Sequence, residues 1–185
     1  TMYSLAELVQ TARFSLVVAT QDWHPQGHIS FADQHGQSPF STISLYGSEQ
    51  TLWPEHCVQG TPGAALHPDL PLHQVGLVLR KGTYSHIDSY SAFRENLGPD
   101  GVRHSTGLGA LLHARHIRRV FLCGLARDYC VGWSALDAKI EGFAAVVLDD
   151  LTRSVFPERA ADTDALFAQA AVAHGSSQLL LDGAP

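Results

Sequence analysis

Cysteine, lysine, aspartate and histidine side chains fall where their types and spacing could support chemistry. Cys130 follows the apolar run Val120–Cys123 and a tight turn, and begins an expected helix. The unpaired N–H groups and dipole of a helix start favour an anion, so we expect the pKa of this thiol to fall. The same N–H groups could stabilise an oxyanion. Most free cysteines are instead small buried hydrophobes, and position alone leaves that interpretation open.

A second group of residues has the composition of a metal site. Asp22 and His24 end the first expected strand, where residues i and i+2 point to the same side, and the following turn can bring His28 to them. His56 lies in a later Pro- and Gly-rich segment and is a fourth candidate. One carboxylate and three imidazoles suit Zn²⁺, Fe²⁺ or Mn²⁺, with positions left for water. The competing interpretation is that these histidines are solvated surface residues.

Lys81 lies at the carboxyl end of the expected strand Val75–Leu79. Open α/β sheets bind ligands beyond the carboxyl ends of their strands, and Cys130 follows such an end too. A lysine there could stabilise a thiolate or a carboxylate, although a solvated strand end is the alternative.

The elements that must position these residues alternate along the chain. Short apolar runs without polar alternation predict five buried strands: Ser15–Ala19, Val75–Leu79, Val120–Cys123, Ala145–Leu148 and Gln178–Leu181. Periodic segments predict four helices: Tyr3–Ala12, Thr106–His116, Tyr129–Glu141 and Glu158–His174. This alternation indicates one α/β domain over residues 1–185 with a mainly parallel sheet. The long segment from Asp22 to Gln74 has little periodicity, and its aromatic residues favour a functional loop.

Composition argues against several classes of function. The 12 basic and 18 acidic residues give a net charge of −6, and the basic residues are scattered, so we expect no nucleic-acid or anionic-membrane partner. No apolar run approaches the roughly 20 residues of a membrane span. Cys57, Cys123 and Cys130 form no CxxC pair, which favours free thiols in a reducing, cytoplasmic compartment. The sequence leaves open whether copies assemble into a homo-oligomer.

Four stretches together resemble nicotinamidases/pyrazinamidases of the isochorismatase-like cysteine hydrolase superfamily. They are TQDWHPQGHISFA (20–32), LWPEHCVQGTPGAALHPDL (52–70), RKGTYSHIDSYSAF (80–93) and VFLCGLARDYCVGWSALDA (120–138). The resemblance implies a three-layer, doubly wound sheet. It also implies hydrolysis of nicotinamide, and of pyrazinamide, to the acid and ammonia, a reaction of pyridine nucleotide salvage.

The resemblance also implies roles for individual residues. Cys130 matches the nucleophile, Lys81 the lysine of an Asp-Lys-Cys triad, and Leu125–Ala126 a cis peptide that aims the Ala126 and Cys130 N–H groups as an oxyanion hole. The side chains implied for substrate binding are Trp53, Tyr90 and Leu125. The implied ligands of one divalent metal ion, most simply zinc, are Asp22, His24, His28 and His56.

One departure from the family pattern concerns the catalytic aspartate. In the family it ends the first, central strand, and this sequence begins at what would be the following helix. Asp33, Asp88 and Asp128 do not match the motif. We therefore expect a preceding segment of about 25–35 residues in the complete protein, the length of a strand and its connection. Without it, two strand edges should be unpaired.

Two other functions remain as alternatives. Another amidase or isochorismatase-type hydrolase of the same fold would need no metal. A non-catalytic protein that lacks the aspartate would bind nicotinamide and release no ammonia.

Overall fold

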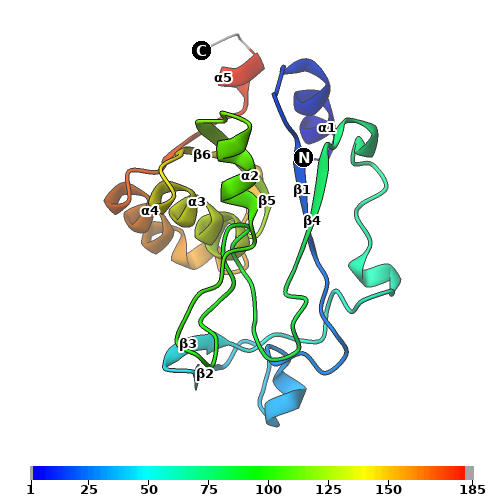
Figure 1. The fold of residues 1–185 in the computed structure, drawn as a ribbon, viewed down its shortest axis with the longest axis vertical. Helices are drawn as coiled ribbons and strands as arrows, with labels where there is room; N and C mark the ends of the chain where they lie inside the picture. Colours follow the sequence, from blue (N-terminus) through cyan, green and yellow to red (C-terminus); the bar gives the residue numbers. More distant parts are fainter. Residues whose placement is uncertain (1, 182–185) are drawn as a thin grey trace.

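Parallel strands form the framework of the computed structural model, which describes residues 2–181. The parallel strands are β1 (Val18–Asp22), β4 (Leu77–Lys81), β5 (Arg119–Leu125), β6 (Ala144–Arg153) and β7 (Ala173–Gly175). β1 pairs with β4, and β6 lies between β5 and β7. An antiparallel hairpin of β2 (Thr42–Leu45) and β3 (Ser48–Thr51) lies apart from them, in the lower part of Figure 1. Mostly parallel strands separated by helices confirm the α/β class.

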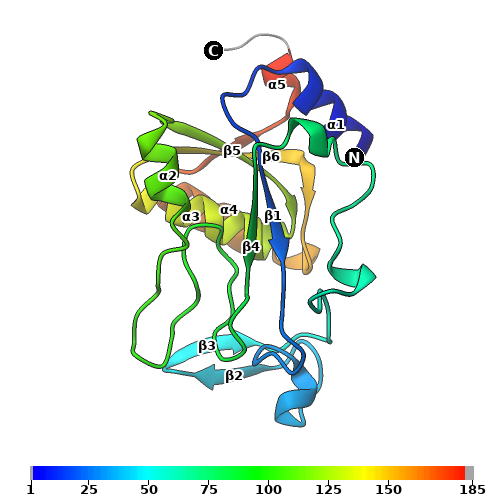
Figure 2. The same cartoon turned by 45° about the vertical axis from the view of Figure 1, so that its right-hand side comes forward.

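Helices cover both faces of the β5–β6–β7 sheet (Figure 2). They are α1 (Met2–Thr11), α2 (Leu108–Ala114), α3 (Gly132–Ile140), α4 (Ala160–Gln169) and α5 (Gln178–Leu181). On one face, Ala135 of α3 and Phe167 of α4 belong to the same buried cluster as Val147 of β6. On the other face, Leu8 of α1 packs with Leu148 of β6. Because successive strand residues point to opposite faces, the two clusters define the expected three layers.

A cavity of about 500 Å³ separates β1 from β5. It is lined mainly by apolar residues, among them Val18 and Ala19 of β1 and Val120 and Leu122 of β5. Within residues 2–181, β1 pairs only with β4 and β5 only with β6, so the facing edges have no strand partner. Figure 1 shows the β1–β4 pair standing away from β5. The two unpaired edges that the sequence predicted are therefore present in the described part of the chain.

The long segment between β1 and β4 is packed against the rest of the molecule. Besides the β2–β3 hairpin it contains the short 3₁₀ turns Ala32–His35, Pro62–Ala64 and Leu72–Gln74. Phe31 and Leu52 are fully buried, and the backbone of Phe31 bridges that of Trp53. Two large apolar side chains of the segment are therefore buried, and the Phe31 ring lies against that of His24.

One expected strand is wrong. Gln178–Leu181 forms α5, and the last strand is instead β7, which falls within and just beyond the expected helix Glu158–His174. A short leucine-rich run fits a helix or a strand equally well, and here Leu180 and Leu181 pack against the α1 side of the sheet. β7 is mostly exposed, so its sequence carries little hydrophobic signal. The first strand also begins later than expected, so Asp22 is its last residue.

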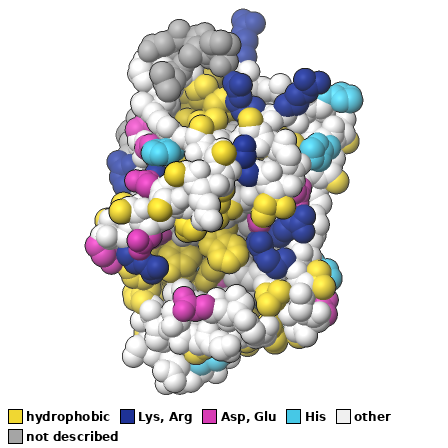
Figure 3. All heavy atoms as spheres, turned by 90° about the vertical axis from the view of Figure 1, so that its left-hand side faces the viewer, with side chains coloured by type: hydrophobic (Ala, Val, Ile, Leu, Met, Phe, Trp, Pro, Cys, Tyr) yellow, Lys and Arg dark blue, Asp and Glu magenta, His cyan; other side chains and the backbone are white. Residues whose placement is uncertain are grey.

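The described surface carries charges of both signs. Figure 3 shows hydrophobic side chains gathered on one face, with lysine or arginine and aspartate or glutamate side chains around them. None of the helices within residues 2–181 has the length and apolar character that crossing a bilayer requires.

Candidate active site

Lys81 connects the candidate nucleophile to the candidate metal cluster. The register of β1 and β4 places Asp22 opposite Lys81, at the carboxyl ends of both strands. The Lys81 side chain is 2% exposed, and its Nζ lies 2.6 Å from Asp22 Oδ1. The same ammonium donates to the Ser89 carbonyl at 2.8 Å and lies 3.3 Å from Cys130 Sγ. The structure thus brings together three residues that are far apart in the sequence.

Lys81 and Asp22 each stabilise the charged form of the other. Burial would lower the pKa of Lys81, but Cys130 and Asp22 together raise it above its usual range. Burial likewise favours protonated Asp22, and the Lys81 ammonium outweighs this and lowers the pKa of the carboxyl group. Both groups are therefore charged at neutral pH, and the ammonium is fixed beside the thiol.

Cys130 differs from expectation in one respect. It lies in a π-helical turn, Arg127–Val131, that precedes α3, and burial raises the pKa of its thiol although Lys81 acts in the opposite direction. The expected fall in pKa is therefore wrong, because loss of water around the thiol disfavours the thiolate more than Lys81 favours it. Ser134 fixes this turn by donating to the Cys130 carbonyl at 2.5 Å and accepting from the Ala92 N–H at 2.8 Å.

Asp22, His24 and His56 converge with metal-ligand geometry. One ligand atom from each lies within 4.8 Å of the others. The Nδ1 of His24 is 2.9 Å from the Gly82 carbonyl, and the Nδ1 of His56 is 2.9 Å from the Pro54 carbonyl. Because a carbonyl only accepts, each Nδ1 carries the proton and each Nε2 keeps a free lone pair, the usual arrangement of metal-binding histidines. Burial, helped by His28, lowers the pKa of His24 to about 4, so its imidazole is neutral.

His28 lies against this group but is engaged elsewhere. Its ring centroid is 4.2 Å from that of His24. Its Nε2 is 3.2 Å from the Ile87 carbonyl, and its Nδ1 is 2.8 Å from Ser30 Oγ. His28 also forms a second possible ligand group with His24 and Asp88. To bind an ion through Nε2, His28 would have to release the Ile87 carbonyl.

An aromatic wall lies beside these polar residues. Trp53 and Tyr129 are in edge contact with ring centroids 4.7 Å apart, and Tyr90 lies 5.3 Å from Tyr129. Trp53 Nε1 donates to the Tyr90 hydroxyl at 3.1 Å. Burial, with a contribution from Asp88, raises the pKa of Tyr90 above its usual range, so the hydroxyl stays protonated.

Most residues singled out in the sequence come together here, and the structure adds others. The peptide bond between Leu125 and Ala126 is cis, as the resemblance implied, and the Leu125 side chain is 73% exposed. Sequence reasoning missed Tyr129 and Ser134. The position of Tyr129 next to Cys130 was an available signal, whereas Ser134 depends on its contact with Ala92, which no local pattern reveals.

The fold and the site define a family. The model of the isochorismatase domain matches residues 2–176. The chain therefore belongs to the isochorismatase domain family.

Its named relatives are more specific. It is 49% identical over 144 residues to the nicotinamidase of Acinetobacter baylyi and 44% identical over 144 residues to that of Escherichia coli, covering 77% and 78% of this chain. The matches span 65% and 66% of those proteins, just under two thirds of their length. A solved nicotinamidase/pyrazinamidase from Acinetobacter baumanii superposes with a TM-score of 0.89 at 42% identity, covering 97% of this chain and 85% of that one.

Two further solved structures contain small ligands. The protein PnC1 of L. infantum, in complex with nicotinate, is 40% identical with a TM-score of 0.81, over 96% of this chain and 79% of that one. The pyrazinamidase of Pyrococcus horikoshii, in complex with zinc, is 30% identical with a TM-score of 0.72, over 95% and 84%.

Proposed function

We propose that the protein is a nicotinamidase that hydrolyses nicotinamide to nicotinate and ammonia, and also accepts pyrazinamide. One observation carries the proposal: Lys81 is in contact with the Cys130 thiol on one side and with Asp22 of the histidine cluster on the other. Lys81 therefore lies between Cys130, the nucleophile that would attack the carboxamide, and the cluster that would anchor the ring nitrogen. The aromatic side chains of Trp53 and Tyr90 supply a surface for a flat heteroaromatic ring.

The donor set fits a divalent ion. Asp22, His24 and His56 would hold it, and His28 would add a fourth ligand after giving up the Ile87 carbonyl. When bound, a Zn²⁺, Fe²⁺ or Mn²⁺ ion would supply a Lewis acid to which the pyridine nitrogen can coordinate. The Pyrococcus relative solved with zinc supports the choice of Zn²⁺.

The chain's own residues then account for the chemistry at the amide. Trp53 packs on the ring and places the carboxamide over Cys130. The Cys130 thiolate attacks the amide carbon, and the N–H groups of Ala126 and Cys130 stabilise the oxyanion. Ammonia leaves with a proton, and water hydrolyses the resulting thioester to nicotinate. Lys81 keeps the anionic groups around it ionised throughout.

The thiol proton requires an acceptor, since burial raises the pKa of Cys130. Asp22 is engaged with Lys81 and belongs to the proposed metal site. We propose that an aspartate on a strand seated between β1 and β5 accepts this proton. The proposal rests on the family pattern and on the cavity between the two strand edges.

The chain's cysteines support the expected compartment. Cys57, Cys123 and Cys130 are all free thiols, which suits a reducing environment. We therefore propose a cytoplasmic enzyme. Its partners are small molecules, as with the relative solved with nicotinate.

A comparison of three amides tests the proposed function. Nicotinamide and pyrazinamide carry a ring nitrogen that can reach the metal site, whereas benzamide has the same size without one. We expect ammonia release from the first two and at least a hundredfold lower kcat/KM for benzamide, because a site built for a polar partner rejects an analogue that lacks it. Equal hydrolysis of all three amides would contradict a metal-anchored ring and favour a general amidase of this fold.

A further inference from the structure

A buried hydrogen-bond network lies behind the aromatic wall, and it begins at Asp88. This side chain is 3% exposed and follows β4 by several residues. Asp88 Oδ1 accepts from the Ser89 N–H at 2.8 Å, and Oδ2 accepts from Gln50 Nε2 at 2.8 Å. The Asp88 carboxylate is thus bound by the backbone N–H of the next residue and by the side-chain amide of Gln50 on strand β3.

Gln50 passes this contact on to the aromatic residues. Its Nε2 lies 2.8 Å from the Tyr90 hydroxyl and 2.8 Å from the Thr51 carbonyl. Gln50 is 4% exposed, so these contacts are shielded from bulk solvent. The Tyr90 hydroxyl in turn accepts from Trp53 Nε1. A continuous chain of contacts therefore runs from Asp88 through Gln50 to Tyr90 and Trp53.

The orientation of the Gln50 amide is determined by its neighbours. Asn96 Nδ2 donates to Gln50 Oε1 at 3.2 Å, while Asn96 Oδ1 accepts from the Tyr90 N–H at 3.2 Å. The Asp88 carboxylate can only accept, so it requires the N–H₂ end of Gln50 on its side. A flipped Gln50 amide would place oxygen against Asp88 and nitrogen against Asn96 Nδ2, and both contacts would be repulsive.

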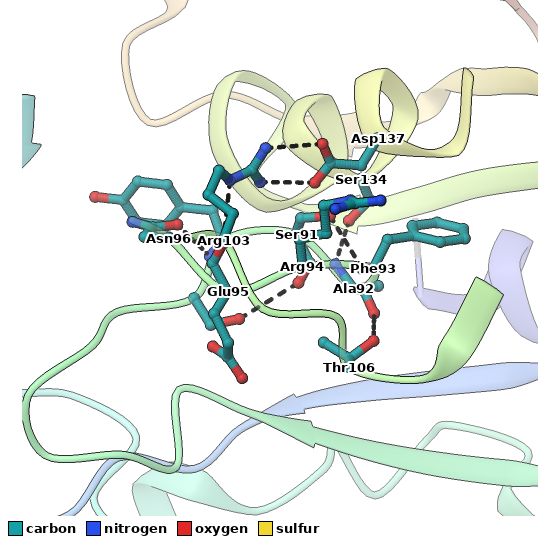
Figure 4. Close-up of polar contacts among 12 residues, drawn as sticks. Ser91, Ala92, Phe93, Arg94, Glu95, Asn96, Arg103, Thr106, Ser134 and Asp137 are labelled. Carbon is teal, nitrogen blue, oxygen red and sulfur yellow. Dashed lines mark hydrogen bonds and ion pairs between the residues drawn. The ribbon is translucent and has the colours of Figure 1, made fainter. Parts of the chain in front are cut away.

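A second group of polar side chains, Arg103 and Asp137, lies next to the network. Figure 4 shows Asn96 beside Arg103, whose guanidinium forms a two-pronged pair with Asp137 of α3 at 2.9 and 2.7 Å. Gln50, Asp88 and Asn96 also line a smaller cavity of about 120 Å³. Water-sized space therefore adjoins the network.

We infer that Gln50, oriented by Asp88 and Asn96, is a positioning residue that fixes the Tyr90 hydroxyl and, through it, the Trp53 indole against which the substrate ring packs. The inference rests on the proposed function for the identity of the ring. In this role neither Gln50 nor Asp88 contacts the reacting atoms. Removing the Gln50 amide should therefore weaken binding of the ring and leave the reactivity of Cys130 unchanged.

A double-mutant cycle between Gln50 and Tyr90 tests this inference. Nicotinamide binding is measured by calorimetry on zinc-loaded protein in a Cys130→Ala background, so that no turnover occurs. We expect Gln50→Met to raise the Kd about tenfold, the size expected for loss of one buried hydrogen bond in a charged network. In a Tyr90→Phe background, which lacks the hydroxyl, the same Gln50 change should raise the Kd less than about twofold.

Further variants keep the test decisive. Gln74→Met is the matched control, because Gln74 lies partly exposed in a 3₁₀ turn outside the network, and it should leave the Kd unchanged. If Gln50→Met does not fold, Gln50→Leu replaces it in the same cycle: it also removes the amide and adds no charge beside Asp88, so the same coupling is expected. With Cys130 present, the rate of Cys130 alkylation should be the same in the Gln50 variant and the parent.

The outcomes separate the two proposals. A Kd increase that is equal with and without the Tyr90 hydroxyl, or an altered alkylation rate, overturns the positioning role of Gln50. Absence of saturable nicotinamide binding to the zinc-loaded parent overturns the proposed function instead.

Discussion

Lys81 is the residue on which the electrostatics of the site depend. Its ammonium is almost fully buried and touches Asp22, the Ser89 carbonyl and the Cys130 thiol. A buried lysine without such partners would lose its charge, because burial disfavours the ammonium. Here the partners keep it charged, and that charge partly offsets the cost of forming a thiolate at Cys130.

The raised pKa of Cys130 leads to a prediction about its alkylation. Iodoacetamide reacts with the thiolate, so the rate at Cys130 should rise with pH and reach its midpoint only above 9.0, the ordinary pKa of this thiol. Lys81 lowers this pKa, so Lys81→Met should shift the profile to still higher pH. Peptide mapping by mass spectrometry separates Cys130 from Cys57 and Cys123. A midpoint below 9.0 in the unmodified chain would contradict the dominance of burial.

His56 provides a test of the metal site. Its Nδ1 faces the Pro54 carbonyl, which leaves Nε2 to bind an ion with Asp22 and His24. We predict that His56→Ala lowers bound zinc well below one ion per chain in elemental analysis. His67→Ala, an exposed histidine near Asp69, serves as the control and should keep its metal. Full zinc occupancy in the His56 variant would remove this residue from the site.

At the scale of elements, hydrogen bonds between segments distant in the sequence hold the site together. Ser134 of α3 ties the turn that carries Cys130 to the segment that follows Lys81, through the Cys130 carbonyl and the Ala92 N–H. Figure 4 shows Ser134 beside Ala92 and Ser91. This single hydroxyl therefore links the turn that carries the nucleophile to the segment around Ala92.

We predict that Ser134→Ala weakens both the fold and the chemistry. The change leaves the Ala92 N–H without its acceptor, which should lower the free energy of unfolding by about 1–3 kcal/mol in urea titrations. Turnover should fall mainly through kcat, because Cys130 is displaced while the ring pocket is not. Ser38→Ala, at an exposed loop position, is the control. An unchanged stability would show that Ser134 does not join the two segments.

The elements illustrate what sequence patterns can predict and where they fail. The runs at Val120 and Ala145 are apolar throughout and predict the strands β5 and β6. The run Gln178–Leu181 contains three leucines, yet it forms α5, because its last two leucines pack on the α1 side of the sheet instead of pairing with β6. The residues of the proposed metal site, together with Lys81 and Cys130, could be singled out from their motifs. The network of Gln50, Asp88 and Asn96 could not, because its contacts join residues 38 and 46 positions apart.

At the scale of the whole molecule, the main feature is the separation between the β1–β4 sheet and the β5–β6–β7 sheet. β1 and β5 face each other across an apolar cavity with unpaired edges in the described chain. Exposed strand edges invite pairing, and an apolar cavity of about 500 Å³ forgoes many packing contacts. A parallel apolar strand is the element that would satisfy both edges at once.

A chimera tests this view of the cavity. Residues 1–185 preceded by the N-terminal segment of the Acinetobacter baylyi nicotinamidase should melt about 5 °C or more above residues 1–185 alone, since the added strand pairs with both edges. The same chimera with two prolines in the added strand is the control, because proline cannot donate to a ladder. Identical melting temperatures for all three proteins would show that no strand enters the cavity.

The central claim is that Cys130 attacks the amide of nicotinamide in a site completed by a bound metal. The most direct measurement is ammonia and nicotinate production by the zinc-loaded protein, compared with Cys130→Ala at equal zinc content. With the strand between β1 and β5 in place, the account predicts equal amounts of ammonia and nicotinate from the protein that has Cys130 and none from the variant. Turnover that persists in Cys130→Ala, or a zinc-loaded parent carrying the added strand that releases no ammonia, would contradict it.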